Sequence, residues 1–177
     1  MADHGHPIGD HGWVMKHDHQ LYNELLRVPF MLRHPQGLGA GKTFDALLQF
    51  HDVLPTYLAA LGRPQDGEGL HGRSFLPVLE GKSAEHRPYV LTAFHGSPHF
   101  CVRDKRHSFI LRPKDWGDDE LYDLTEDPQE KRNLIKEQPE VARELGKLIP
   151  AWFGIKDQKA KILQMQLRYE IADTPIK

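Results

Sequence analysis

The stretch Asp3–His17, DHGHPIGDHGWVMKH, decides the fold because it sets metal-ligand side chains among glycines directly before an apolar run. That run, Arg27–Arg33 (RVPFMLR), predicts a buried strand that begins at Val28. Polar residues punctuated by glycine beside a core strand are typical of an active-site loop carried by a rigid sheet. The sequence therefore predicts a functional loop on the sheet of an α/β protein.

The chemistry of this loop centres on three residues. Asp3 offers a carboxylate and His4 an imidazole at neighbouring positions, a pair that suits Ca²⁺, Mn²⁺ or Zn²⁺ without choosing among them. Gly5 lets the backbone turn tightly beside such an ion. Lys16 follows along the same loop and can reach back toward an anion held by the metal. Each residue alone also has an ordinary alternative, as a turn, a surface pair or a solvated lysine.

Several spaced segments of the chain resemble the carboxy-terminal half of the sulfatase family, within the alkaline-phosphatase-like superfamily. The first is DHGHPIGDHGWVMKH with LYNELLRVPFML, and three more follow in order: HDVLPTYLAALG (51–62), LHGRSFLPVLEGK (70–82) and ELYDLTEDPQEKRNL (120–134). The resemblance implies that Asp3 and His4 bind a divalent cation, with calcium favoured over manganese or zinc. It also implies that Lys16 contacts the sulfate or a phosphate-like group of the substrate.

Two histidines of the loop are candidate proton donors, His11 and His17. The stretch from Lys16 to Tyr22 is a residue or two longer than is usual in the family, which leaves the roles of His17 and His19 open. In the mechanism that the resemblance implies, a hydrated formylglycine attacks sulfur while the metal and Lys16 stabilise negative charge.

The family's nucleophile is absent from this chain. Family members carry upstream a C/S-x-P-x-R motif whose Cys or Ser becomes formylglycine, and no such motif occurs here. The one cysteine, Cys101, stands in FCVRDKR and is expected to be a half-buried strand residue. We therefore expect a carboxy-terminal fragment or truncated product of a sulfatase-like enzyme, with little or no turnover by itself.

Composition excludes several classes of partner. The net charge of −2 gives no reason to expect nucleic acid or an anionic membrane as a partner. No apolar run is long enough to cross a membrane and no signal peptide opens the chain, so the location stays open.

The loop 34–43, HPQGLGAGKT, is not a phosphate-binding P-loop, because Gly37 and Gly41 enclose three residues where that motif needs four.

The predicted architecture is α/β, with three parts. Residues 1–87 are expected to be a remnant of the alkaline-phosphatase-like sandwich, residues 88–156 an α+β subdomain, and residues 157–177 a helical tail. The subdomain is predicted to hold a four-stranded antiparallel sheet covered by one helix. The expected strands are Tyr89–His95, Phe100–Arg103, Ser108–Arg112 and Glu120–Leu124, and the expected helices are 18–26, 52–61, 74–80, 139–153 and 157–171.

His95 and His99 flank these strands. In sulfatase-like enzymes this subdomain leans over the mouth of the active site, so either histidine could contact substrate. The alternative is a surface histidine at the end of a strand.

Two functions from different classes remain. One is hydrolysis of a sulfate ester, on a small molecule or a sugar, with phosphonate or phosphodiester hydrolysis as the alternative within the superfamily. The other is a non-catalytic module that binds a metal or a protein. For either function we expect a homo-oligomer, in which a second copy covers an exposed sheet edge.

Overall fold

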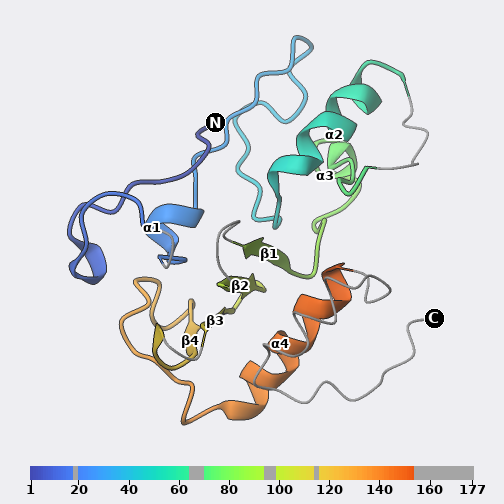
Figure 1. The fold of residues 1–177 in the computed structure, drawn as a ribbon. Helices are drawn as coiled ribbons and strands as arrows, with labels where there is room; N and C mark the ends of the chain where they lie inside the picture. The colour runs from blue at the N-terminus through green and yellow to red at the C-terminus, as the bar shows by residue number, and fades with distance from the viewer. Residues whose placement is uncertain (18–19, 64–69, 94–98, 114–115, 154–177) are drawn as a thin grey trace. The chain divides into compact units, whose positions relative to one another are not determined.

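The computed structural model describes residues 1–17, 20–63, 70–93, 99–113 and 116–153 (Figure 1). The elements in chain order are the 3-10 helix η1 (Asp10–Gly12), α1 (Asn23–Leu26), η2 (Phe50–Asp52), α2 (Val53–Ala60), α3 (Leu76–Leu79), β1 (Val90–Ala93), β2 (Phe100–Arg103), β3 (His107–Leu111), β4 (Glu120–Asp123) and α4 (Pro139–Phe153). None of the helices in these ranges combines the length and the apolar character needed to cross a membrane.

The chain forms two compact units. Unit 1 contains Met1–Pro29 together with the described residues from Leu91 onward, and unit 2 contains Phe30–Val90. The functional loop thus groups with the C-terminal sheet, although about sixty residues separate them in sequence. The predicted division of the protein at residues 87 and 156 stays a prediction.

The four-stranded antiparallel sheet is confirmed, in the order β1-β2-β3-β4. The register pairs Cys101 with Ile110 across β2 and β3, and Ile110 with Glu120 across β3 and β4. Cys101 and Ile110 share one face with Tyr122, and Leu21 completes a buried cluster there. Because successive side chains of a strand alternate, Val102, Phe109 and Leu121 point to the other face, and all are fully buried.

Helix α4 has the predicted bounds and packs against β2 and β3. Pro139 occupies the first helical position, where its missing N–H costs no hydrogen bond. Ala142, Leu145 and Ile149 are buried along one face, at the spacing that an amphipathic helix requires. The sheet is therefore covered on both faces, which explains why strand β2 is buried at every position.

The predicted strand Val28–Arg33 is wrong. These residues form no regular structure, and the side chain of Met31 is 83% exposed. A strand exists only where a neighbour takes up its backbone N–H and C=O groups, and no strand described here pairs with this segment. The apolar run is real, but in this chain it lies at the surface.

Of the three helices predicted in the first ninety residues, one is confirmed and two are shorter than predicted. The helix expected over 18–26 is reduced to α1, with residues 18 and 19 outside the described part. The helix over 52–61 is confirmed as α2, and that over 74–80 is reduced to α3. The helix expected over 157–171 lies outside the described residues.

Unit 2 is organised around Asp52, whose side chain is completely buried. Its carboxylate accepts hydrogen bonds from both Nε and Nη2 of Arg87, and from the backbone N–H groups of Gln49 and Arg73, each at 2.9 Å. Thr56, one turn into α2, donates its hydroxyl to the carbonyl of Asp52. One carboxylate thus ties the entry to α2, the segment before α3 and the segment before β1.

Candidate functional site

The functional loop is a short hairpin. Ile8 and Val14 form an antiparallel bridge, and the N–H of Met15 donates to the carbonyl of Pro7 at 3.0 Å. Gly9 (φ 121°) allows the turn at η1, because L side chains rarely adopt that backbone conformation. The hairpin reverses the chain and returns Lys16 to the neighbourhood of His4.

Asp3, His4 and Lys16 do come together, as the sequence predicts. The Nζ atom of Lys16 lies 3.3 Å from Nε2 of His4, and that same Nε2 lies 3.7 Å from Oδ2 of Asp3. The N–H of His4 donates to the carboxylate of Asp3 and lowers the pKa of that carboxyl. The side chain of Asp3 is 84% exposed, so the group faces outward.

Gly5 fixes this group to α1. Its N–H donates to the carbonyl of Leu25 at 2.7 Å, at the C-terminal end of that helix. A Cβ added to Gly5 would lie 1.9 Å from the carbonyl oxygen of Glu24. Only glycine allows so close an approach, so the third residue of the motif is explained by packing against α1.

The donor set fits two ligands of a divalent cation. Nδ1 of His4 contacts the carbonyl of Gly5 at 2.6 Å and must be the protonated nitrogen there, which leaves the lone pair of Nε2 for a metal or for Lys16. Two ligands of one ion, each about 2.1–2.4 Å from it, lie about 3–3.5 Å apart, close to the observed 3.7 Å. Among the described residues no three His, Cys, Asp or Glu side chains are grouped to hold a metal. Asp3 and His4 therefore offer two donors whose spacing suits a divalent cation, and their role as metal ligands stays a prediction.

His11 is held by three contacts. Its Nδ1 lies 2.6 Å from Oε1 of Glu24, and its Nε2 lies 2.8 Å from the backbone carbonyl of Glu130. Its ring stacks on Tyr22 with centroids 3.8 Å apart and planes 2° apart. Since both ring nitrogens are engaged, this geometry leaves neither facing a substrate, and the role of His11 in proton transfer stays a prediction.

His17, the other candidate proton donor, is exposed and lies beside Trp13, with ring centroids 5.1 Å apart. Its role in proton transfer also stays a prediction.

Sequence reasoning missed the residues that frame His11. Glu130 has a fully buried carboxylate that accepts from the N–H of Asn23 at 2.6 Å and from Nη2 of Arg103 at 2.8 Å. Arg103 also donates to the side chain of Asn23 at 2.8 Å. The acidic positions of the quoted segments LYNELL and DPQEKRNL could have pointed to Glu24 and Glu130, but nothing local indicates that they meet at one histidine.

The remaining predicted residues lie elsewhere. His95 falls outside the described residues. His99 is completely buried, edge-on to Trp116 at 5.3 Å, so the expectation of a surface histidine is wrong and its contact with substrate stays a prediction. Cys101 lies in β2 as expected but is fully rather than half buried, and burial raises the pKa of its thiol to about 11.

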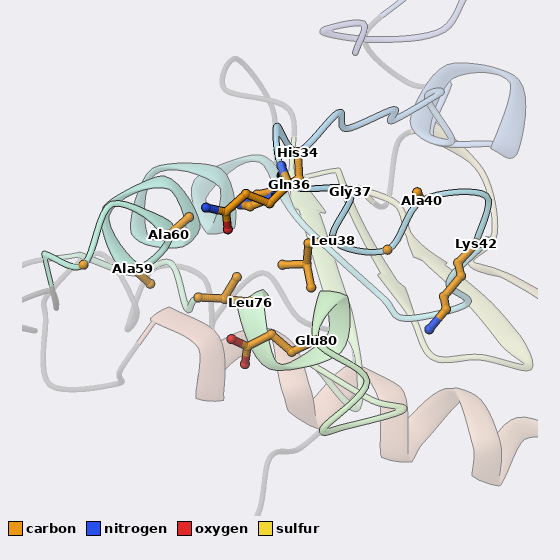
Figure 2. Close-up of a pocket in the computed structure, with 12 residues that line it drawn as sticks. His34, Gln36, Gly37, Leu38, Ala40, Lys42, Ala59, Ala60, Leu76 and Glu80 are labelled. Carbon is orange, nitrogen blue, oxygen red and sulfur yellow. Dashed lines mark hydrogen bonds between the residues drawn. The ribbon is translucent and has the colours of Figure 1, made fainter.

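Unit 2 contains a separate open pocket of about 600 Å³ (Figure 2). Figure 2 shows it framed by the loop 34–42, the end of α2 and α3. Its polar lining residues, His34, Gln36, Lys42 and Glu80, surround an apolar floor that includes Leu38 and Leu76. None of the predicted site residues lines it, and we assign it no chemistry.

Comparison with known proteins gives consistent matches. The chain is 35% identical to the arylsulfatase of Clostridium perfringens over 147 residues, covering 76% of this chain and 28% of that protein. It is 32% identical to the N-acetylglucosamine-6-O-sulfatase of Bacteroides thetaiotaomicron, covering 76% of this chain and 25% of that protein. The chain thus spans about a quarter of the length of these relatives.

Solved structures agree with the sequence matches. A protein solved in complex with its substrate D-glucosamine-2-N,6-O-disulfate superposes with a TM-score of 0.74 at 26% identity, over 88% of this chain and 34% of that one. The phosphonate monoester hydrolase of Agrobacterium radiobacter superposes with a TM-score of 0.68 at 21% identity, over 86% and 34% of the two chains. The second match shows a shared fold.

These matches define the class of protein as the sulfatases, hydrolases of sulfuric esters. A family model described as N-sulphoglucosamine sulphohydrolase, C-terminal, matches residues 9–151. The chain belongs to that family, and the resemblance drawn from the sequence is confirmed.

Proposed function

We propose that this chain is the part of a sulfuric ester hydrolase that supplies two metal ligands, Asp3 and His4, and one anion contact, Lys16. The observation that carries the proposal is the 3.3 Å approach of the Lys16 ammonium to Nε2 of His4, beside the carboxylate of Asp3. The resemblance drawn from the sequence assigns these roles to the same three side chains. The named activities of the relatives support hydrolysis of sulfate esters.

Asp3, His4 and Lys16 would each have a separate role in this function. A bound divalent cation, for which we propose calcium, would stabilise charge on the ester oxygens. Asp3 would hold that ion through a carboxylate oxygen and His4 through Nε2, with Nδ1 anchored on the carbonyl of Gly5. Lys16, whose ammonium lies beside the same Nε2, would donate to the sulfate oxygens.

A sulfated sugar is the substrate class we propose. Support comes from a relative named for N-acetylglucosamine 6-O-sulfate and from a structural neighbour that binds a disulfated glucosamine. The formylglycine nucleophile is not part of this sequence, so we expect the isolated chain to have little or no turnover. Arylsulfatase activity of the purified chain clearly above that of a Lys16→Ala variant would contradict this expectation.

The metal ligands can be tested with Mn²⁺ as a paramagnetic probe, because its effect on NMR line widths reports even weak binding. Resonances of residues 3–5 and of Lys16 should broaden first in the wild-type chain. Asp3→Ala and His4→Ala should abolish that selectivity, whereas Asp10→Ala, a matched change at an exposed aspartate of the same loop, should leave it intact. Broadening that is uniform, or that persists in both ligand variants, would refute the assignment.

A further inference from the structure

His11 lies between two hydrogen-bond acceptors. A backbone carbonyl oxygen cannot donate, so Nε2 of His11 must carry a hydrogen toward Glu130. The carboxylate of Glu24, when ionised, also only accepts, so Nδ1 must carry a hydrogen as well. A neutral imidazole has one N–H, and both contacts together require the imidazolium.

Glu130, one of the two acceptors of His11, is fixed independently of the loop. The Glu130 carboxylate is buried and bound by the N–H of Asn23 and by Arg103 of β2. The amide of Asn23 also donates to the carbonyl of Pro128 at 2.9 Å. These contacts join α1, β2 and the turn after β4 without using the hairpin, and His11 connects the hairpin to that turn.

We propose that His11 is a positioning residue whose imidazolium docks the loop bearing Asp3, His4 and Lys16 onto α1 and the turn after β4, and whose deprotonation releases that loop. The proposal rests on the proposed function only in assuming that Asp3, His4 and Lys16 take part in catalysis. It concerns how these residues are held in place, and His11 itself need not touch substrate.

The direction of the pH effect follows from the contacts. Burial acts to lower the pKa of His11, but the hydrogen bonds to the Glu130 carbonyl and to Glu24 outweigh it and leave that pKa raised. The other groups close by are the Glu130 carboxylate, which Arg103 neutralises, and Tyr22, whose pKa burial raises to about 12, so that it stays uncharged. Docking should therefore be complete on the acid side and be lost as pH rises through the pKa of docked His11.

Amide hydrogen exchange on the 177-residue chain, followed by NMR from pH 6 to 9, separates docking from hairpin folding. The N–H of Gly5 donates to Leu25 of α1 and reports docking, whereas the N–H of Met15 donates to Pro7 and reports the hairpin itself. The protection factor of Gly5 should fall with a midpoint equal to the titration midpoint of the His11 ring. Each pKa unit between docked and free His11 corresponds to about a tenfold change in the docking equilibrium.

Two variants sharpen the test. His11→Asn tolerates the left-handed backbone at this position (φ 51°) but lacks the second donor, so Gly5 should be poorly protected at every pH. His6→Gln changes an exposed histidine of the same loop and should behave as wild type.

Three results would overturn the proposal. They are Gly5 protection that does not follow the His11 titration, wild-type protection in His11→Asn, and a parallel loss of protection in β2 and β3, which would mean global unfolding. Loop docking as described but without selective Mn²⁺ broadening would instead leave this inference standing and remove the proposed function.

Discussion

Replacing Asp52 by Asn should severely destabilise unit 2. The substitution keeps the shape of the side chain but removes the charge that faces Arg87, and the side chains of this pair are 0% and 5% exposed. A buried guanidinium left without its counter-ion costs about 3–5 kcal/mol, and because the pair is buried, solvent screening does not reduce that cost. The N–H groups of Gln49 and Arg73 would also compete for one remaining acceptor oxygen.

The chain provides a convenient assay for this prediction. All three tryptophans, Trp13, Trp116 and Trp152, lie within unit 1, whereas helix α2 lies in unit 2. Urea unfolding followed by circular dichroism should show an early loss of helix in Asp52→Asn. A typical urea slope of about 1–3 kcal/mol per molar converts the expected loss into a midpoint shift of more than 1 M.

The control is Asp45→Asn, at an exposed aspartate of the same unit, which should unfold like wild type. A loss of less than about 1 kcal/mol in Asp52→Asn would refute the reasoning, because it would mean that Arg87 is solvated or finds another partner. The tryptophan fluorescence transition should move less than the helix signal if the two units unfold separately.

Three further changes have definite expected outcomes. Burial lowers the pKa values of His51 and His86, so the folded state binds fewer protons than the unfolded chain. The free energy of unfolding should therefore fall as pH drops through about 6.5. Urea midpoints at pH 5 and 7.5 measure this change, and equal midpoints would contradict it. Gly5→Ala should detach the loop, because its methyl group would meet the carbonyl of Glu24 and break the hydrogen bond to α1, which contributes about 1 kcal/mol of stability. Hydrogen exchange of the residue-5 amide measures this, and unchanged protection would refute it. Met31→Lys should weaken the homo-oligomer expected from the sequence, because it places a charge on an exposed apolar run. Sedimentation equilibrium measures the mass of each protein, and equal masses for variant and wild type would exclude this run as the contact.

The C-terminal sheet and α4 could be predicted from the sequence because their signals are local. Each strand is a short β-rich run closed by turn residues, and α4 begins at a proline and carries a regular apolar stripe. The strand expected at Val28–Arg33 does not form, because a strand also depends on neighbours that no local pattern reveals.

The candidate site shows the same division. Asp3, His4 and Lys16 could be singled out as candidates because one motif spans them all. Glu130 was missed because it meets His11 across 119 positions of sequence, and its buried carboxylate is explained only by residues of α1 and β2.

That separation also fixes the order of events on the ribosome. Unit 2 is one continuous segment, so all of its contacts are available once residue 90 has left the ribosome. Docking of the hairpin must wait for Glu130, which at 5–20 residues per second is synthesised roughly 6–24 s after His11. During that interval the loop that carries Asp3, His4 and Lys16 has α1 available but lacks the carbonyl of Glu130, so its docking should be completed only after unit 2 has been synthesised.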